Sequence, residues 1–290
     1  MDSPHGATVT AEDFGLKGPR GWAFRGVRLD APPGALVAIE GPSGSGRTCL
    51  LLALTGRMRP SEGRAEVGGL RLPRQMAAAR RISALGPVPG VSELDPAFTV
   101  AEHLRERALL QRRFDGSLRA LLRPRSERTA AARDRIDTAL AAAGLDPATL
   151  PKAERTSVRD LERLEALRLS VALALIGRPR LLAVDDTDLK LSDAERAEAW
   201  ELLRSVADSG TTVLAVCSQA PGGAITVRTD NSVATATTAT TSTESVSDTA
   251  DVTEADATDA SEPAEAPEAT TTEKTTDEGT ADAFAETGRA

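Results

Sequence analysis

The chain has 290 residues, of which 40% are hydrophobic and only 2% aromatic, so its core must consist mainly of Ala, Leu and Val. This composition favours helices on a parallel sheet over an aromatic-rich β-sandwich, and the two cysteines exclude a disulfide scaffold. The net charge is −8 and no apolar run reaches the roughly 18–20 residues of a membrane span, so we expect a soluble intracellular protein.

Segments typical of strands alternate with segments typical of helices up to about residue 230. The predicted strands are Leu36–Glu40, a hairpin over Glu66–Leu72, Leu181–Val184 and Thr212–Cys217. The predicted helices are Cys49–Leu54, Thr99 to about Arg113, Arg133–Ala143, Arg159–Ile176 and Ser192 to near Gly210, with capping boxes at Thr99–Glu102 and Ser192–Glu195. Strands joined through helices imply a parallel sheet covered on both faces.

The last 60 residues have a different composition from the rest of the chain. Residues 231–290 hold 14 acidic residues against Lys274 and Arg289, a net charge of −12, whereas residues 1–230 sum to +4. Thr and Ala supply 30 of these residues, and so polar a segment cannot offset the entropy of ordering it. We predict a disordered acidic tail; the alternative is a tail that docks on a basic surface.

The most informative stretch is a Gly-rich loop between the strand Leu36–Glu40 and the helix after it. It consists of Gly41, Pro42, Ser43, Gly44, Ser45, Gly46, Arg47 and Thr48, followed by Cys49. Glycines let successive N–H groups converge on a phosphate at the positive end of a helix, and the Thr48 hydroxyl is a ligand for Mg²⁺. The loop matches G-x-x-x-x-G-K-[ST] except at Arg47, where Lys is expected. We predict phosphate binding; a tight turn without a ligand is the alternative.

With this loop the chain resembles the ATP-binding subunits of the ATP-binding cassette (ABC) transporter family. Further similarity lies, in the family's order, in Arg81–Leu85, Phe98–Leu104, Ile176–Asp186 and Gly210–Val216. The resemblance covers about residues 7–230. It implies an α/β fold with a P-loop NTPase-type parallel sheet core, an inserted helical subdomain at about residues 99–177, and a strand at Arg81–Leu85.

The resemblance also implies ATP and Mg²⁺ as ligands. The loop, residues 41–49, would bind the nucleotide phosphates, and Thr48 and Asp185 would hold the Mg²⁺. Phe14 lies where the family has an aromatic residue that stacks on adenine. Trp22 is a competing candidate for that role. The alternative for Phe14 is that it is an ordinary packing residue of the core.

The departures from the family pattern fall on groups that the family uses for hydrolysis. Asp186 replaces the catalytic Glu and is one methylene shorter, and Ser218 replaces the switch His. Three further positions also differ: the Q-loop Gln falls at Gly86 or Pro87, the D-loop Asp at Ser192, and the Leu-Ser-Gly-Gly-Gln signature at Leu161–Glu165. Glu162 would bring a like charge toward the γ-phosphate of an opposite subunit. Leu161, Leu164 and Leu167 also recur at helical spacing, so this helix is alternatively a simple packing element.

Residues 112–135 are rich in arginine and carry a net charge of +5. A solvated helical face is the simplest interpretation; a membrane surface, a membrane partner and the acidic tail are alternatives. Nucleic acid is a poor match because aromatic residues are not interleaved with the arginines.

The resemblance implies an ATP-binding subunit that forms a homodimer or heterodimer with a separate membrane-spanning transporter partner, in the cytoplasm or at the inner face of the cell membrane. Because of the departures, we predict that ATP hydrolysis is weak or absent and that nucleotide binding acts structurally or as a regulator. Two alternatives remain open: a slow but active ATPase that drives transport, and an interaction scaffold that does not bind nucleotide.

Overall fold

The computed structural model describes residues 5–114 and 125–229. All of them belong to one compact unit, residues 1–238, and a second unit, residues 239–290, lies outside the described residues. The predicted acidic tail over residues 231–290 lies outside them too, and the Arg-rich stretch is described only in part.

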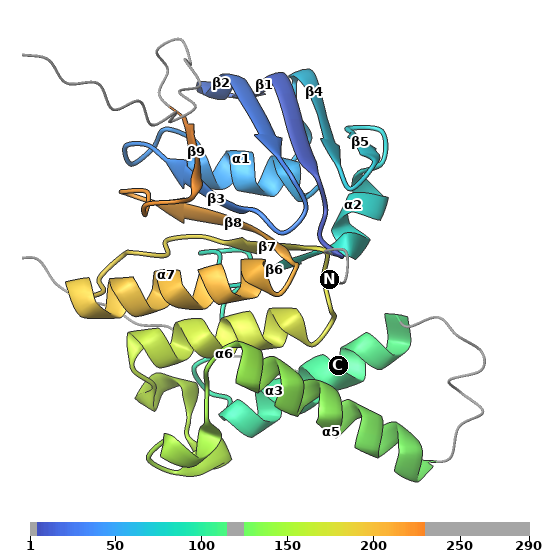
Figure 1. Ribbon diagram of the computed structural model, residues 1–290, viewed down its shortest axis with the longest axis vertical. Coiled ribbons are helices and arrows are strands. Elements are labelled where there is room, and N and C mark those ends of the chain that lie inside the picture. The colour runs from blue at the N-terminus through green and yellow to red at the C-terminus, as the bar shows by residue number, and fades with distance from the viewer. Residues whose placement is uncertain (1–4, 115–124, 230–290) are drawn as a thin grey trace, which may run out of the picture. The chain divides into compact units, whose positions relative to one another are not determined.

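Within the described residues the strands form two sheets (Figure 1). The parallel sheet has the order β6-β7-β8-β3-β9, with bounds Ser83–Leu85, Leu181–Val184, Thr212–Cys217, Leu36–Glu40 and Ile225–Arg228. The antiparallel sheet has the order β2-β1-β4-β5, with bounds Gly21–Ala31, Val9–Gly18, Glu62–Val67 and Leu70–Leu72. The predicted parallel sheet is therefore confirmed, and the antiparallel sheet, apart from its β4–β5 hairpin, was not predicted.

The helices cover both faces of the parallel sheet (Figure 1). Helix α1 (Arg47–Leu54) lies between the two sheets, and α2 (Met76–Ile82) precedes β6. On the opposite face lie α6 (Arg163–Leu175) and α7 (Asp193–Asp208), with α3 (Val100–Phe114) and α5 (Arg125–Ala142) beyond α6. Three short 3₁₀ turns, Pro147–Thr149, Ala153–Arg155 and Val158–Asp160, connect α5 to α6.

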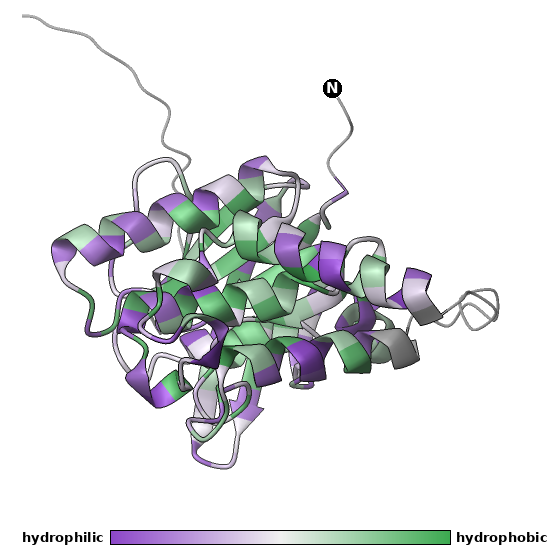
Figure 2. Ribbon diagram, turned by 90° about the horizontal axis from the view of Figure 1, so that it is seen from below, coloured by the Kyte–Doolittle hydropathy of each residue, from purple (hydrophilic) through white to green (hydrophobic). Residues whose placement is uncertain are grey.

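Alternation along the central strands explains this layering. Val37 and Ile39 of β3 are buried in the core that α1 shares with the antiparallel sheet. Leu36 and Ala38 are buried in the other core, which contains α6 and α7. Because successive side chains of a strand point to opposite faces, a strand apolar at every position must be covered on both sides. Seen from the helical side, hydrophobic residues gather where helices lie on the sheet (Figure 2).

Several predicted boundaries are wrong: the helix predicted from Arg133 begins at Arg125, and the hairpin predicted from Glu66 begins at Glu62. Two others differ for identifiable local reasons. The helix predicted from Arg159 begins only at Arg163, because residues 158–160 form a 3₁₀ turn and Glu162 has an extended backbone. The strand predicted from Arg81 begins at Ser83, because Arg81 and Ile82 complete α2. Helices α3, α5 and α6 fall within the predicted helical subdomain, about residues 99–177, whose bounds stay a prediction.

Candidate functional site

The Gly-rich loop lies between the carboxyl end of β3 and the start of α1. In the parallel sheet β3 is next to β8, and β8 is next to β7. The residues that follow β7 and β8 are Asp185 and Ser218, so the fold brings both to the edge of the sheet where the loop lies. This edge, at the carboxyl ends of parallel strands, is where α/β proteins bind their ligands.

The backbone of the loop requires glycine at two positions. Gly44 and Gly46 have φ of 81° and 85°, in the left-handed region that side chains disfavour. At position 46 a Cβ would also overlap the carbonyl oxygen of Ala23 in β2, whereas the space around Gly44 is open. Among the described residues, no acceptor is found for the N–H groups of Gly44, Gly46, Arg47 or Thr48. Unpaired donors at a helix start are what a phosphate would satisfy.

Thr48 and Asp185, the two residues predicted to hold Mg²⁺, meet in the structure. The Thr48 hydroxyl donates to Asp185 Oδ2 at 2.6 Å, although 137 residues separate the two. Burial raises the pKa of the Asp185 carboxyl; the Thr48 hydrogen bond opposes this rise, and the neighbouring Asp186 adds to it. The described residues contain no cluster of three or more His, Cys, Asp or Glu side chains that could hold a metal alone. One hydroxyl and one carboxylate fit Mg²⁺, which takes its other ligands from phosphates and water.

Arg47 does not stand free in the loop. Its Nη1 donates to the carbonyl oxygen of Cys217, the last residue of β8, at 2.6 Å. The Cys217 thiol beneath it is inert, because burial, aided by the charges of Asp188 and Glu40, raises its pKa to about 12. Arg47 therefore ties the phosphate loop to the end of the neighbouring strand.

Asp186 follows Asp185 directly, and Ser218 follows Cys217 at the end of the neighbouring strand β8, so the fold brings both near the loop. Asp186 is half-buried with a φ of 49°, and its N–H donates to Asp185 Oδ1 at 3.0 Å. Ser218 is exposed, and its N–H donates to Asp188 Oδ2 at 2.7 Å. Their roles stay predictions.

The positions of the Q-loop Gln and the signature have backbone roles here. Gly86 N–H donates to the Ala183 carbonyl at 2.8 Å, and the Pro87 carbonyl accepts the Asp185 N–H at 2.9 Å. Glu162 precedes α6 and is exposed, while Leu164 and Leu167 are buried, as the packing interpretation expects. A hollow of about 310 Å³ lies between these parts, lined among others by Asp185, Asp186, Arg163 and Leu167.

Phe14 lies in the core of the structure, as the packing alternative expects, and its role toward adenine stays a prediction. Its side chain is 0% exposed, and its ring centroid lies 5.7 Å from that of Phe24 in the core between the sheets. Trp22, the competing residue, is half-buried beside Ala23, the residue that touches Gly46. Arg25 lies 4.7 Å and Lys17 5.8 Å from its ring centroid. The role of β2 as the wall of the loop was not foreseen, because no sequence signal marks Ala23.

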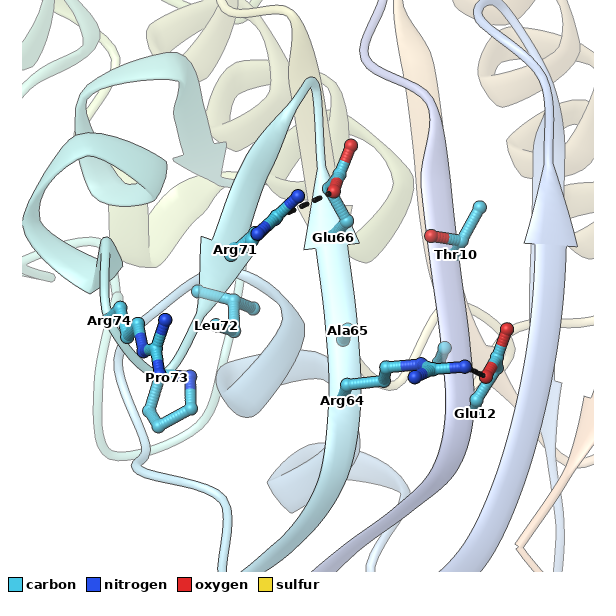
Figure 3. A pocket seen from close by; sticks show the side chains of 10 residues that line it. Thr10, Glu12, Arg64, Ala65, Glu66, Arg71, Leu72, Pro73 and Arg74 are labelled. Atoms are coloured by element: carbon cyan, nitrogen blue, oxygen red, sulfur yellow. Dashed lines mark hydrogen bonds and ion pairs between the residues drawn. The ribbon is translucent and has the colours of Figure 1, made fainter.

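Another hollow, of about 410 Å³, lies away from this edge, on the outer face of the antiparallel sheet (Figure 3). Its charged side chains are largely paired with one another: Arg64 with Glu12, and Arg71 with Glu66 at 3.7 Å. Exposed pairs of this kind contribute little and leave few free donors for a ligand. The hollow is separate from the loop site.

The fold and the site are those of the P-loop nucleotide-binding class. The features that define it are the parallel sheet, the Gly-rich loop with two glycines of positive φ, and the hydrogen bond between Thr48 and Asp185. The sequence model of the ABC transporter family matches residues 24–188, and the chain belongs to this family. Within the described residues, no helix has the length and apolarity needed to cross a membrane.

Relatives and solved structures agree with this assignment. Two proteins named Nod factor export ATP-binding protein I are similar: that of Cupriavidus metallidurans is 32% identical over 64% of this chain, and that of Cupriavidus pinatubonensis 31% over 72%. The matched region covers 54% of each, so the chain spans about half the length of these relatives. A dimeric bacterial ABC transporter cassette matches with a TM-score of 0.58 at 19% identity, over 76% of this chain and 94% of that one. This last match supports the fold.

Proposed function

We propose that this chain is an ATP-binding subunit that binds Mg-ATP and couples to, or regulates, a separate membrane partner, with ATP hydrolysis weak or absent. The observation that carries the proposal is the Thr48–Asp185 pair, 2.6 Å apart, directly beside a loop of unpaired N–H groups. Residues distant in sequence have no other evident reason to meet at a helix start.

Binding follows from the groups at the loop. The N–H groups of Gly44, Gly46, Arg47 and Thr48 would donate to the nucleotide phosphates, and the start of α1 adds its positive dipole. Thr48 and Asp185 would hold Mg²⁺, which supplies neutralisation of phosphate charge when bound. Most of these donors belong to the main chain, so the change to Arg47 leaves them in place. Residues 41–49 therefore constitute the proposed phosphate site.

Weak hydrolysis is proposed because the groups that would handle the attacking water are changed. The Asp186 carboxylate is one methylene shorter than Glu, and general-base geometry tolerates little displacement. Ser218 has no imidazole, and neither Gly86 nor Pro87 has an amide. A slow active ATPase is the second candidate, since Asp186 lines the same hollow as Asp185 and its carboxylate has access to water there.

The partner is proposed from the family alone. The relatives are named for the export of Nod factor, and a solved cassette of the same fold is dimeric. We therefore propose a dimer of cassettes, of one or two kinds of chain, at the inner face of a membrane-spanning transporter. The described residues contain no membrane-crossing helix, so any such partner would have to supply the membrane part.

Calorimetry of Mg-ATP binding, with phosphate release measured on the same preparation, tests the proposal. We expect saturable binding that is lost in Asp185→Asn, and turnover far below about 1 per second, the low end of ordinary enzymes. Asp186→Glu alone should restore little, because catalytic groups act as a unit. If no saturable binding is seen at millimolar ATP, the interaction scaffold is favoured. If slow phosphate release is measured, the slow active ATPase is favoured.

A further inference from the structure

Three arginines from separate elements gather at the end of α1 that is opposite the phosphate loop. Arg57 follows α1, Arg80 belongs to α2 and Arg107 to α3. Arg57 and Arg107 are half-buried, and Arg80 is more exposed. This arginine cluster has no part in the nucleotide site, because the loop lies at the other end of α1.

Every hydrogen bond of the cluster goes to a neutral group. Arg57 Nη1 donates to the Thr55 carbonyl and to Ser83 Oγ, each at 3.0 Å. Arg80 Nη1 donates to the Gly56 carbonyl at 2.8 Å, and Arg107 Nε to the Leu173 carbonyl at 3.1 Å. Among the described residues none of the three has a carboxylate within ion-pair distance. Many other arginines of the chain do have one: Arg25, Arg28, Arg64, Arg71, Arg168, Arg196, Arg204 and Arg228.

Arg57 is affected by the positive charges of both other arginines. Burial, together with the charges of Arg80 and Arg107, lowers the pKa of Arg57 to about 10. Burial also lowers the pKa of Arg107. Partly buried like charges without a counter-charge are costly, and a bound anion would offset that cost. Carbonyls at the end of α1 compensate only in part, with the partial charge of a helix dipole.

We propose that the arginine cluster binds a small phosphate-bearing anion, such as inorganic phosphate or a phosphate monoester. Guanidinium groups present planar pairs of donors that match phosphate oxygens, and the nitrogens not used on carbonyls remain available. The anion belongs on the Arg57 and Arg80 side. The hollow of about 160 Å³ beside Arg107 does not suit an anion, because the carboxylates of Glu93 and Glu106 also line it.

The alternative is that Arg57 and Arg80 only cap the carbonyls that end α1. Glutamine separates the two interpretations, because its amide can still donate to a carbonyl but has no charge. The test variant is therefore Arg57→Gln with Arg80→Gln. The matched control is Arg81→Gln, an exposed neighbour on α2 outside the cluster.

The experiment measures the Tm of the full chain with inorganic phosphate, and with chloride at the same ionic strength. We expect phosphate to raise the Tm of the wild type and of Arg81→Gln by about 3–6 °C at tenfold excess over Kd. The double variant should lose this rise and keep the rise caused by Mg-ATP. Thr48→Ala should lose the rise in Tm caused by Mg-ATP and keep the rise caused by phosphate. Failure of the proposed nucleotide site is therefore distinguishable from failure of the arginine cluster.

Two results would overturn the proposal: no phosphate effect on the wild type, or an equal effect on the double variant, which would assign the phosphate to the loop. If the double variant does not fold, the single variant Arg80→Gln replaces it, and calorimetry measures its affinity for phosphate. We expect that affinity to fall severalfold, and an unchanged affinity would overturn the proposal. Vesicles with and without phosphatidic acid identify the source. If the protein binds vesicles that contain phosphatidic acid and free phosphate does not displace it, the phosphate that binds the cluster belongs to a lipid headgroup.

Discussion

Helix α1 starts after Gly46 in a left-handed conformation, with no side-chain cap and no acidic residue in its first turn, so its first N–H groups are unpaired. Helix α6 starts after Glu162, whose N–H donates to the Glu165 carboxylate at 2.8 Å in the first turn of the same helix. Both ends have the positive dipole that attracts anions. The first is open to an external anion, and the second already has two carboxylates of its own.

The difference concerns what each function needs. The proposed phosphate binding at α1 would use main-chain donors and two glycines, so we expect it to tolerate Arg47 in place of Lys. A helix start that must approach a phosphate across an interface needs small, uncharged residues, and α6 has Glu162 and Arg163 there. Binding by backbone N–H groups survives a change of side chain. Binding that needs two surfaces to come close together does not, because a larger or charged side chain keeps them apart. The predictions below break or sharpen this comparison, from the largest expected effect to the smallest.

Gly46→Ala should have the largest effect. Alanine would combine strain at a φ of 85° with overlap on the Ala23 carbonyl, at a cost of about 2–4 kcal/mol in the free energy of unfolding. Mg-ATP binding should be lost as well. The matched control is Gly44→Ala, where φ is 81° but the space is open, so about 1–2 kcal/mol is expected. Equal losses in urea denaturation would mean that contact with β2 is unimportant.

Asp185→Asn should weaken Mg-ATP binding by at least about tenfold in calorimetry without destabilising the free protein. Burial raises the pKa of Asp185, so the folded state holds its proton more tightly than the unfolded state. The resulting stabilisation is present at low pH and is lost as pH rises through the folded pKa. Asn has no charge; its single amide oxygen can still accept the Asp186 N–H, and its NH2 group can donate to the Thr48 hydroxyl oxygen in place of the bond that Asp185 accepts.

The Tm of Asp185→Asn should therefore equal or exceed that of the wild type at neutral pH. The difference should shrink toward about pH 4, near the pKa of an unperturbed Asp. A variant that is less stable at neutral pH would contradict this account of Asp185.

Arg47→Lys should have a smaller effect. Lysine cannot reproduce the same fork, and loss of the hydrogen bond to Cys217 should cost about 0.5–1.5 kcal/mol in the free energy of unfolding. Because the main-chain donors are unchanged, Mg-ATP should still bind. Loss of binding in this variant would show that the side chain, and not the backbone, determines affinity.

Glu162→Ser should leave stability within about 0.5 kcal/mol, since serine also caps helices well. Removing the carboxylate should raise the fraction of ATP-dependent dimer in light scattering, while hydrolysis stays low. Glu198→Ser, on the exposed face of α7, is a control for the loss of one negative charge. An equal rise in the control would attribute the effect to net charge.

The sequence predicted the central strands and the phosphate loop because their signals are local. Leu36–Glu40 and Thr212–Cys217 are almost continuous apolar runs, which are typical of buried parallel strands. The glycine spacing of the loop, between a strand and a helix, is specific to phosphate-binding loops. Strands β1 and β2 were missed, because several irregularities shift their register and blur the alternation of apolar and polar residues. The choice between Phe14 and Trp22 depended on that register. The contact of Arg47 with Cys217 spans 170 residues, and no local pattern encodes it.

The pairing of β3 with β8 has a consequence for how the protein is made. Leu36 lies opposite Val213, so the strand that leads into the phosphate loop meets its neighbour only after most of the described chain has emerged from the ribosome. Contacts this distant in sequence are slow to form, and parallel pairing delays them further. The proposed nucleotide site is thus completed late in synthesis. Until then the apolar strand Leu36–Glu40 lacks both of its neighbouring strands, β8 and β9, and is exposed to aggregation.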